Sequence, residues 1–396
     1  MKPLCFSNLI SPCTVDDFFQ HHWEKQFLHV ARNEPNYFEA ILNTLDIDDF
    51  LSQQNLQPDA IKLVRQGVEI PQTAWTKNAV SSHDATVAIA ADVEKILQHY
   101  HQGATIIING AQKTIPSLLR ACVVLEQELK IPMQNNIYIT PPKAQGFSMH
   151  YDTHDIFSVQ IKGSKTWRFY DTGENIPTQK QPFSQEPKLI KELTMQAGDL
   201  LYMPRGAVHE AFSSEEATIH VNFSIKPRYG FHLIEELAQL AEKEAVFFRR
   251  TTPHGFNTEE DRHTYIADFK AHFHLLLDKY GAELLLKNQE NLFVKNQIMN
   301  HKGRFQDALA SEQLTLETIV VRRTGFSVLT SKEGNATLVK YGNQEIKIPE
   351  FIENAIFFQD KPFKIRDIRG LVTHKGKLDL VRELLRAGFL EIPTQC

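Results

Sequence analysis

A series of short, β-rich segments in the middle of the chain constrains its fold more than any other feature. Each segment is rich in apolar and β-branched residues, and glycine, proline or charged turn residues separate it from the next. The segments cover residues 137–140, 157–161, 166–170, 189–194, 199–203 and 218–224. Short strands so closely spaced along a chain are typical of a β-sandwich or a barrel. The sequence therefore predicts one such β-structure between about residues 136 and 228.

Helical patterns flank this β-rich region on both sides. Apolar residues recur at helical spacing over residues 15–24, 37–42, 46–53, 92–102 and 115–129 before it, and over residues 233–248 and 259–286 after it. An Asp, Asn or Thr at or near the start of the first three segments can cap a helix there. We therefore predict helices before the β-structure and a separate helical segment behind it.

The C-terminal hundred residues have a mixed pattern. Residues 363–371 and 378–387 have helical spacing, and residues 389–392 have the composition of a strand. A helix that ends at Gly388 before an apolar strand is typical of a winged helix. We therefore predict an α+β chain in three parts: residues 1–228, with a barrel core of about 136–228, then residues 229–300 and residues 301–396.

Composition excludes several classes of protein. The chain has 396 residues, 43 basic and 48 acidic side chains and a net charge of −5, which argues against a dedicated nucleic-acid binder. No stretch approaches the roughly 18 apolar residues that span a membrane. The four cysteines, Cys5, Cys13, Cys122 and Cys396, form no C-x-x-C pair, so neither a disulfide framework nor a cysteine zinc site is predicted. These observations favour a cytoplasmic protein.

Two histidines and an aspartate have the spacing of a metal site. Residues two apart on a strand point to the same side, so His150 and Asp152 would both face the interior of a barrel. His209, on a strand that returns beside them, would complete two histidines and one carboxylate on one face of a metal. This ligand set is the facial triad of non-haem Fe(II) oxygenases. A lone H-x-D sequence is more often an ordinary surface or core feature, so the prediction depends on His209.

Polar residues also alternate along the segment of residues 218–224. Period-two spacing places His220, Asn222 and Ser224 on one face, where a buried strand would carry apolar side chains. We therefore expect a polar group or ligand to lie against this face. Hydrogen bonding within the sheet is an equally good explanation for Asn222 and Ser224.

Four stretches together resemble the JmjC-type cupins of the ribosomal oxygenase family. They are residues 136–142, residues 150–155, residues 160–168 and the segment from Gly198 to His209, whose glycine, Pro-x-Gly and histidine spacing is similar to the second cupin motif. The similarity is strongest over about residues 95–228. It implies a double-stranded β-helix barrel, followed by a helical dimerisation segment and a winged-helix-like domain. It also implies an Fe(II)- and 2-oxoglutarate-dependent hydroxylase of protein residues that consumes O2.

The resemblance implies roles for individual residues. His150, Asp152 and His209 match the Fe(II) ligands, and Lys165 matches the lysine that binds the far carboxylate of 2-oxoglutarate, although an exposed hairpin lysine is the alternative. Tyr138 matches a tyrosine that donates to the same carboxylate, unless it is a barrel-wall aromatic residue. Ser224 matches a small polar residue near the cosubstrate, with Asn222 as a supporting partner. Independently of the resemblance, His154 lies too far along an extended strand from His150 to be a ligand, and it is expected either in the substrate pocket or as a residue that supports the ligands.

Several functions remain open at this point. The resemblance implies a protein substrate, with an arginyl or a histidyl residue of a ribosomal protein as the expected target. The chain is also expected to form a homodimer. Alternatives are a hydroxylase of a natural-product precursor peptide and a non-catalytic cupin. A DNA-binding regulator would use a C-terminal basic cluster of Arg322, Arg323, Lys361, Lys364, Arg366 and Arg369, but its net charge is modest, so nucleic acid is not the expected partner. Substrate choice is expected to depend on the loop of residues 172–188.

Overall fold

The computed structural model describes residues 4–53, 56–80, 87–171, 176–183, 185–352, 354–370 and 373–393. The chain divides into two compact units, residues 1–226 and residues 227–396. The division lies two residues before the predicted end of the barrel part. The predicted further boundary at residue 301 stays a prediction.

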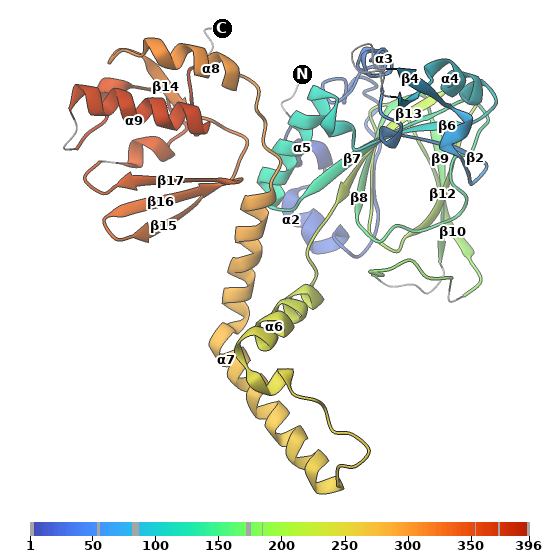
Figure 1. Ribbon diagram of the computed structural model, residues 1–396. Helices are drawn as coiled ribbons and strands as arrows, with labels where there is room; N and C mark the ends of the chain where they lie inside the picture. The colour runs from blue at the N-terminus through green and yellow to red at the C-terminus, as the bar shows by residue number, and fades with distance from the viewer. Residues whose placement is uncertain are drawn as a thin grey trace. The chain divides into compact units, whose positions relative to one another are not determined.

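Two antiparallel sheets form the barrel of the first unit (Figure 1). The larger sheet has the order β1-β11-β8-β13-β7-β6-β2-β3, and the smaller has the order β10-β9-β12. The strands of the larger sheet are β1 (Leu28–Val30), β11 (Leu200–Met203), β8 (Ile156–Lys162), β13 (Thr218–Ile225), β7 (Met133–Thr140), β6 (Thr105–Asn109), β2 (Ile61–Arg65) and β3 (Val68–Ile70). Those of the smaller sheet are β10 (Lys188–Met195), β9 (Lys165–Asp171) and β12 (Val208–Ser213). Each strand predicted in the β-rich region is present.

The two sheets share a core and enclose a cavity. Apolar side chains from both sheets pack together, including Trp167 and Phe169 of β9 and Ile156 and Leu201 of the larger sheet. Period-two alternation turns these residues inward, because successive side chains of a strand point to opposite faces. The predicted barrel of an α+β chain is therefore confirmed.

The N-terminal region contains strands that the sequence did not predict. Besides the helices α1 (Phe6–Ile10), α3 (Thr44–Leu51), α4 (Val93–His101) and α5 (Pro116–Leu129), it supplies β1, β2, β3 and β6 to the larger sheet and a separate β4 (Thr76–Val80) and β5 (Val87–Ala91) pair. Strands β2 and β6 are short and largely buried. A short apolar run of this kind has no diagnostic periodicity, so the prediction of helices alone was incomplete.

Two of the predicted N-terminal helices were also wrong in detail. Residues 37–42 form successive turns, in which the Tyr37 and Ile41 amides donate to carbonyls three residues earlier, at Glu34 and Phe38. The segment is too short to repay helix nucleation. Residues 15–24 form α2 (Val15–Asp17), which continues into a π-helical turn, Phe18–His22.

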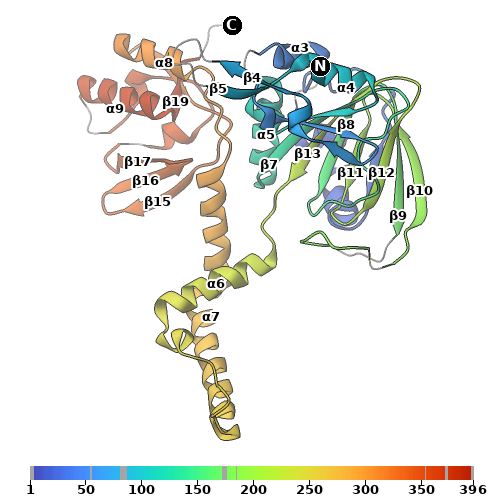
Figure 2. The same cartoon turned by 45° about the vertical axis from the view of Figure 1, so that its right-hand side comes forward.

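Helices, a small sheet and a meander make up the second unit (Figure 2). The helices are α6 (Gly230–Glu244), α7 (Glu259–Asn296), α8 (Arg304–Ala310) and α9 (His374–Ala387). Strands β14 (Ile319–Arg322), β18 (Phe363–Lys364) and β19 (Leu390–Glu391) form one sheet, and β15 (Leu329–Glu333), β16 (Ala336–Tyr341) and β17 (Gln344–Pro349) form the meander. Helix α7 contains a non-helical residue, Gly281, with a φ of 49°.

The C-terminal prediction was correct for α9 and the following strand but wrong for residues 363–371. That segment is β18 followed by a single 3-10 turn, Ile365–Asp367, and its last residue, Leu371, lies outside the described residues. Phe363 and Ile365 are buried in the core of this unit. Over the described residues, none of the helices has both the length and the apolar character needed to cross a membrane.

Candidate functional site

The three predicted metal ligands lie together and line the cavity. One ligand atom from each of His150, Asp152 and His209 lies within 4.8 Å of the other two, and His150 Nε2 is 3.9 Å from Asp152 Oδ2. His209 is on β12, whereas His150 forms an isolated bridge and Asp152 follows it in a loop. The expectation of a regular strand for His150 and Asp152 was therefore wrong, but the three side chains converge as expected.

Backbone hydrogen bonds hold these three residues in place. The amides of His150 and His209 each donate to the other's carbonyl, at 3.0 and 2.8 Å, and the Gly206 amide donates to the Asp152 carbonyl at 2.9 Å. Gly206 has a φ of +84°, a left-handed conformation that favours glycine. Loop and strand are thus tied together at the residues that carry the ligand atoms.

Both histidines are oriented by a carbonyl two residues earlier in the chain. His150 Nδ1 lies 2.8 Å from the Ser148 carbonyl, and His209 Nδ1 lies 2.8 Å from the Ala207 carbonyl. Because a carbonyl only accepts, each Nδ1 must carry the proton. In the neutral ring this leaves the Nε2 lone pair available to a metal, which is the usual arrangement of metal-binding histidines.

The electrostatics suit a divalent cation. Burial, with repulsion from His150, lowers the pKa of His209 to about 4, so this ring is neutral at neutral pH. Burial opposes ionisation of Asp152, but attraction from His209 and His150 outweighs it and holds the pKa of this carboxyl below its ordinary value. A neutral imidazole, a second imidazole nitrogen and a carboxylate are donors that fit Fe(II).

Lys165 lines the same cavity as a buried amine without an acidic partner among the contacts described. It is 4% exposed, and its Nζ contacts Thr140 Oγ1 at 3.4 Å and His220 Nδ1 at 3.5 Å. Burial lowers its pKa to about 7. This position contradicts the alternative of an exposed hairpin lysine. A buried amine that contacts only neutral groups forms a site for an anion.

Tyr138 and the polar face of β13 line the same cavity as this amine. His220, Asn222 and Ser224 are all buried and line a cavity of about 300 Å³ together with Tyr138 and Lys165. The Tyr138 ring stacks on His220 with centroids 4.7 Å apart. Burial raises the pKa of Tyr138, so its phenol remains a hydrogen-bond donor. Tyr138 is a cavity residue as well as a wall residue, and His154 lines the same cavity outside the three-residue cluster.

The structure adds cavity residues that sequence reasoning missed. Thr140 contacts Lys165 from β7, and Lys180 reaches the cavity from the predicted specificity loop. His220 was expected on the polar face of β13, and the structure adds its contact with Lys165. Period-two alternation had placed His220 on the correct face but could not reveal its partner. In that loop, residues 172–175 and 184 lie outside the described residues.

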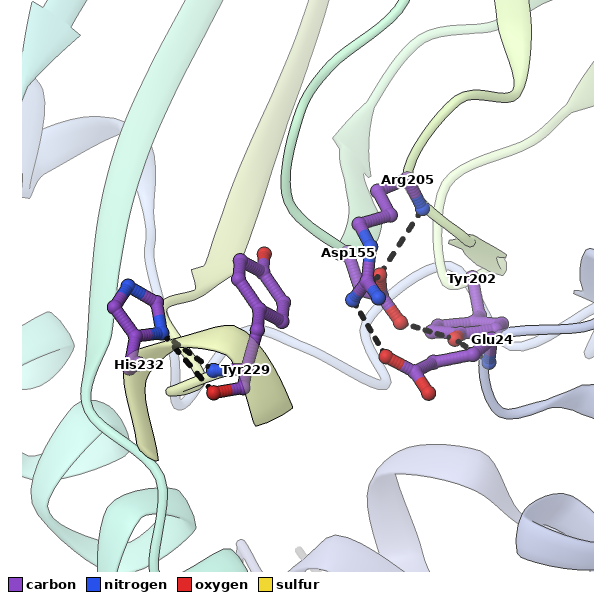
Figure 3. A network of polar contacts seen from close by, with 6 residues as sticks. All are labelled: Glu24, Asp155, Tyr202, Arg205, Tyr229 and His232. Atoms are coloured by element: carbon purple, nitrogen blue, oxygen red, sulfur yellow. Dashed lines mark hydrogen bonds and ion pairs between the residues drawn. The ribbon is translucent and has the colours of Figure 1, made fainter. Parts of the chain in front are cut away.

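A buried polar network supports the residues around the cluster (Figure 3). The Asp155 carboxylate accepts hydrogen bonds from the Tyr202 hydroxyl at 2.6 Å and from the Arg205 amide at 3.0 Å. The Arg205 guanidinium also pairs with Glu24 at 2.5 Å, and the Glu24 amide donates to the Tyr202 hydroxyl. The network therefore joins the N-terminal segment, the end of the Asp152 loop and the turn before His209.

Comparison with known proteins agrees with this geometry. Residues 108–232 match the JmjC domain family. The curated bifunctional lysine-specific demethylase and histidyl-hydroxylase NO66 is 30% identical in Culex quinquefasciatus, over 60% of this chain and 37% of that protein. The Aedes aegypti protein of the same name is 29% identical over 56% of this chain and 34% of its own length. This chain thus spans about a third of the length of the curated relatives that it matches.

A solved structure matches almost the whole chain. The Escherichia coli ribosomal oxygenase YcfD, in complex with cobalt and 2-oxoglutarate, superimposes with a TM-score of 0.55 over 95% of this chain and 97% of its own, at 14% identity. At this identity the likeness shows a common fold. The resemblance to JmjC-type cupins, noted from the sequence, is confirmed.

Proposed function

We propose that this chain, a JmjC-domain protein of the ribosomal oxygenase type, is an Fe(II)- and 2-oxoglutarate-dependent dioxygenase that hydroxylates a side chain of a protein. One observation carries the proposal: the cluster of His150, Asp152 and His209 and the buried amine of Lys165 line the same cavity. A metal site alone would suit many cupins. The Lys165 amine in the same cavity adds a place for the far carboxylate of 2-oxoglutarate.

Each residue of the cavity would then have a definite task. His150 Nε2, Asp152 and His209 Nε2 would hold Fe(II) from one side, leaving its remaining positions for 2-oxoglutarate and O2. Lys165, with the Tyr138 phenol and the Ser224 hydroxyl, would bind and orient the cosubstrate, and Asn222 would support them. Bound Fe(II) supplies the oxidative chemistry, which splits O2 between hydroxylated product and succinate and releases CO2. The buried walls keep water away from the reacting groups.

The charge of the cavity favours a histidyl over an arginyl target. Among its described lining residues the acidic side chain is Asp152, a proposed metal ligand, whereas Lys62, Lys165 and Lys180 are cationic. A buried guanidinium needs a carboxylate partner, which this cavity would not provide. A neutral imidazole has no such requirement. The matched NO66 proteins are named histidyl-hydroxylases, and YcfD is named a ribosomal oxygenase, so we propose a histidine of a ribosomal protein.

The regulator alternative is weakened by ion pairs in the second unit. Arg322 pairs with Asp360 at 2.6 Å, and Arg323 is buried against Asp307 and Glu391. Lys364 and Arg366 both pair with Glu317, at 2.9 and 2.7 Å. Four of the six cations of the predicted basic cluster are therefore offset by carboxylates, which reduces their attraction for phosphate.

Succinate formation and ribosome mass spectrometry together test the proposed function. Purified protein with Fe(II), 2-oxoglutarate and O2 is expected to form succinate slowly without a substrate. Ribosomal proteins from a deletion strain are expected to lose a 16 Da mark on one histidine, and re-expression should restore it. Absence of succinate would overturn the enzyme assignment. A ribosome unchanged by the deletion would overturn the ribosomal substrate and favour a small peptide precursor.

Binding of 2-oxoglutarate is expected to weaken as the pH rises. The free protein holds the Lys165 pKa at about 7, and a bound carboxylate favours the charged amine and raises that pKa. Above pH 7, binding therefore requires uptake of a proton, and the dissociation constant should rise about tenfold per pH unit. Calorimetric titration of the Mn(II)-loaded protein between pH 7 and 9 measures this slope. Lys165→Arg should have a nearly flat profile, since arginine stays protonated; equal slopes would contradict the explanation.

We further propose that α6 and α7 form a homodimer interface and that residues 301–396 are a winged-helix-like domain. Leu237 and Ala241 of α6 pack against Leu276 of α7, yet Ile234 and Leu275 on the same helices are 65% and 66% exposed. Exposed apolar side chains gathered on two helices favour an interface.

The proposal of a winged-helix-like domain rests on the end of residues 301–396. There α9 ends at Gly388 and β19 then pairs with β14, as a helix and wing would. The free thiols of Cys5, Cys13 and Cys122 favour a cytoplasmic location.

The dimer proposal predicts a change of mass on substitution of one exposed leucine. Leu275→Glu places a charge in the proposed apolar interface, so the protein should change from dimer to monomer in light scattering at micromolar concentration. Lys270→Glu, at another exposed position of α7, is the matched control and should remain dimeric. A monomeric wild-type protein, or a dimer that tolerates Leu275→Glu, would contradict this interface.

A further inference from the structure

We propose that Lys180 selects the protein substrate by pairing with an acidic side chain close to the hydroxylated residue. The proposal rests on the proposed function, because it assigns a substrate contact to the same cavity. Lys180 lines that cavity but belongs to the segment of residues 176–183, outside the strands that carry the metal and cosubstrate residues. It is therefore placed to meet the substrate rather than the cosubstrate.

The hydroxyl of Tyr151 holds this segment beside the metal cluster. Tyr151 lies between His150 and Asp152 in the chain and is buried. Its hydroxyl accepts a hydrogen bond from the Gln181 amide at 2.6 Å, and it lies 3.3 and 3.1 Å from the carbonyls of Gln179 and Gln181. These contacts fix the residues on both sides of Lys180. The position of its backbone is consequently tied to the residue between two of the ligands.

A second set of contacts packs the same segment on the turn before His209. A Cβ atom added to Gly206 would lie 2.5 Å from Pro177 Cδ, so proline and glycine are in close contact. Phe183, near the other end of the segment, packs near Tyr151 with ring centroids 6.2 Å apart. The segment thus rests on both elements that carry the cluster, and Lys180 projects from a supported backbone.

Of the three lysines described in the cavity lining, Lys180 is the one whose charge can pair with a substrate. Lys62 pairs with Glu69 at 2.9 Å, and Lys165 is buried in the proposed cosubstrate site. Lys180 is exposed, and the ion pairs found among the described residues do not include it, although its charge also attracts the Asp152 carboxylate through space. The charges of Fe(II), Asp152, the 2-oxoglutarate dianion and Lys165 cancel, so the loaded cavity retains the positive charge of Lys180. A carboxylate beside the target residue would complete this pair.

A binding selection from a peptide library tests the proposal without turnover. The probe is a pool of peptides with a central histidine and randomised flanking positions, captured on the full-length protein loaded with Mn(II) and N-oxalylglycine. Wild-type protein should enrich aspartate or glutamate at one flanking position about fivefold, as an exposed ion pair allows. Lys180→Glu should lose this enrichment and prefer lysine or arginine there. The wild-type preference should weaken in 0.5 M salt, because salt screens exposed charges.

Lys77→Glu is the matched control, since Lys77 is exposed on β4 of the same unit, lies outside the loop of residues 172–188 and is not among the cavity residues described. It should select the same peptides as the wild type. Enrichment that is absent, or that Lys180→Glu leaves unchanged, would overturn the proposal. Succinate formation by the same protein preparations, measured without peptide, tests the dioxygenase assignment separately. A normal succinate rate with no acidic preference would therefore reject the role of Lys180 alone.

Discussion

Replacing Asp152 with alanine is expected to lower succinate formation from 2-oxoglutarate at least about 100-fold, since loss of a group that only supports a metal ligand already costs 10- to 100-fold. Asp152 supplies the single carboxylate of the cluster and the only negative charge among its three ligands. Its loss leaves two imidazoles, which bind Fe(II) more weakly and leave an extra position open to water. The measurement is succinate formed per enzyme at saturating Fe(II) and 2-oxoglutarate, together with Mn(II) affinity.

A control must separate loss of the metal from loss of the fold. Asp59→Ala removes an exposed carboxylate of the same unit, outside the cavity, and should keep the wild-type rate. The melting temperature of metal-free Asp152→Ala should stay close to that of the metal-free wild type, because the loop is also held through the Asp152 carbonyl. Full turnover by Asp152→Ala would contradict the assignment of Asp152 as a metal ligand.

The metal cluster illustrates what a sequence can predict about a site. His209 follows a glycine and proline turn whose geometry requires those residue types, so its segment can be identified without the fold. His150 and Asp152 can be predicted as metal ligands only once His209 has been identified. The three side chains converge although His150 and Asp152 are not on a regular strand. An isolated antiparallel bridge between His150 and His209 holds the two backbones together, as pairing between two strands would.

Contacts across the cavity could not be predicted from the sequence. Alternation along β13 places His220 on the inner face, but its contact with Lys165 depends on the register between the two sheets. Strands β2 and β6 have apolar runs too short to be distinguished from helix by periodicity. The position of Lys180 depends on hydrogen bonds between the Tyr151 hydroxyl and backbone groups about thirty residues away. Such bonds have no local signal.

Substitution of Lys165 is expected to have the second large effect, on the affinity for 2-oxoglutarate. The amine is buried, and the groups that it contacts are neutral. Thr140 and His220 can orient the amine, but neither neutralises its charge. Burial also lowers the pKa of His220 well below its ordinary value, so this ring adds no competing positive charge at neutral pH. An incoming carboxylate therefore gains a strong partner, and the amine gains the anion that its burial lacks.

Lys165→Met is accordingly expected to raise the dissociation constant of 2-oxoglutarate about 100-fold, since removing one partner of a buried charge pair costs several kcal/mol. Methionine has a similar length and keeps the packing against Trp167, so the melting temperature of the free protein should fall little or rise. Calorimetry on the Mn(II)-loaded protein measures the affinity, and Mn(II) binding itself should stay unchanged. Lys165→Arg, which keeps a cation, should lose much less affinity than Lys165→Met. Equal losses for the two variants would show that shape, and not charge, determines binding at this position.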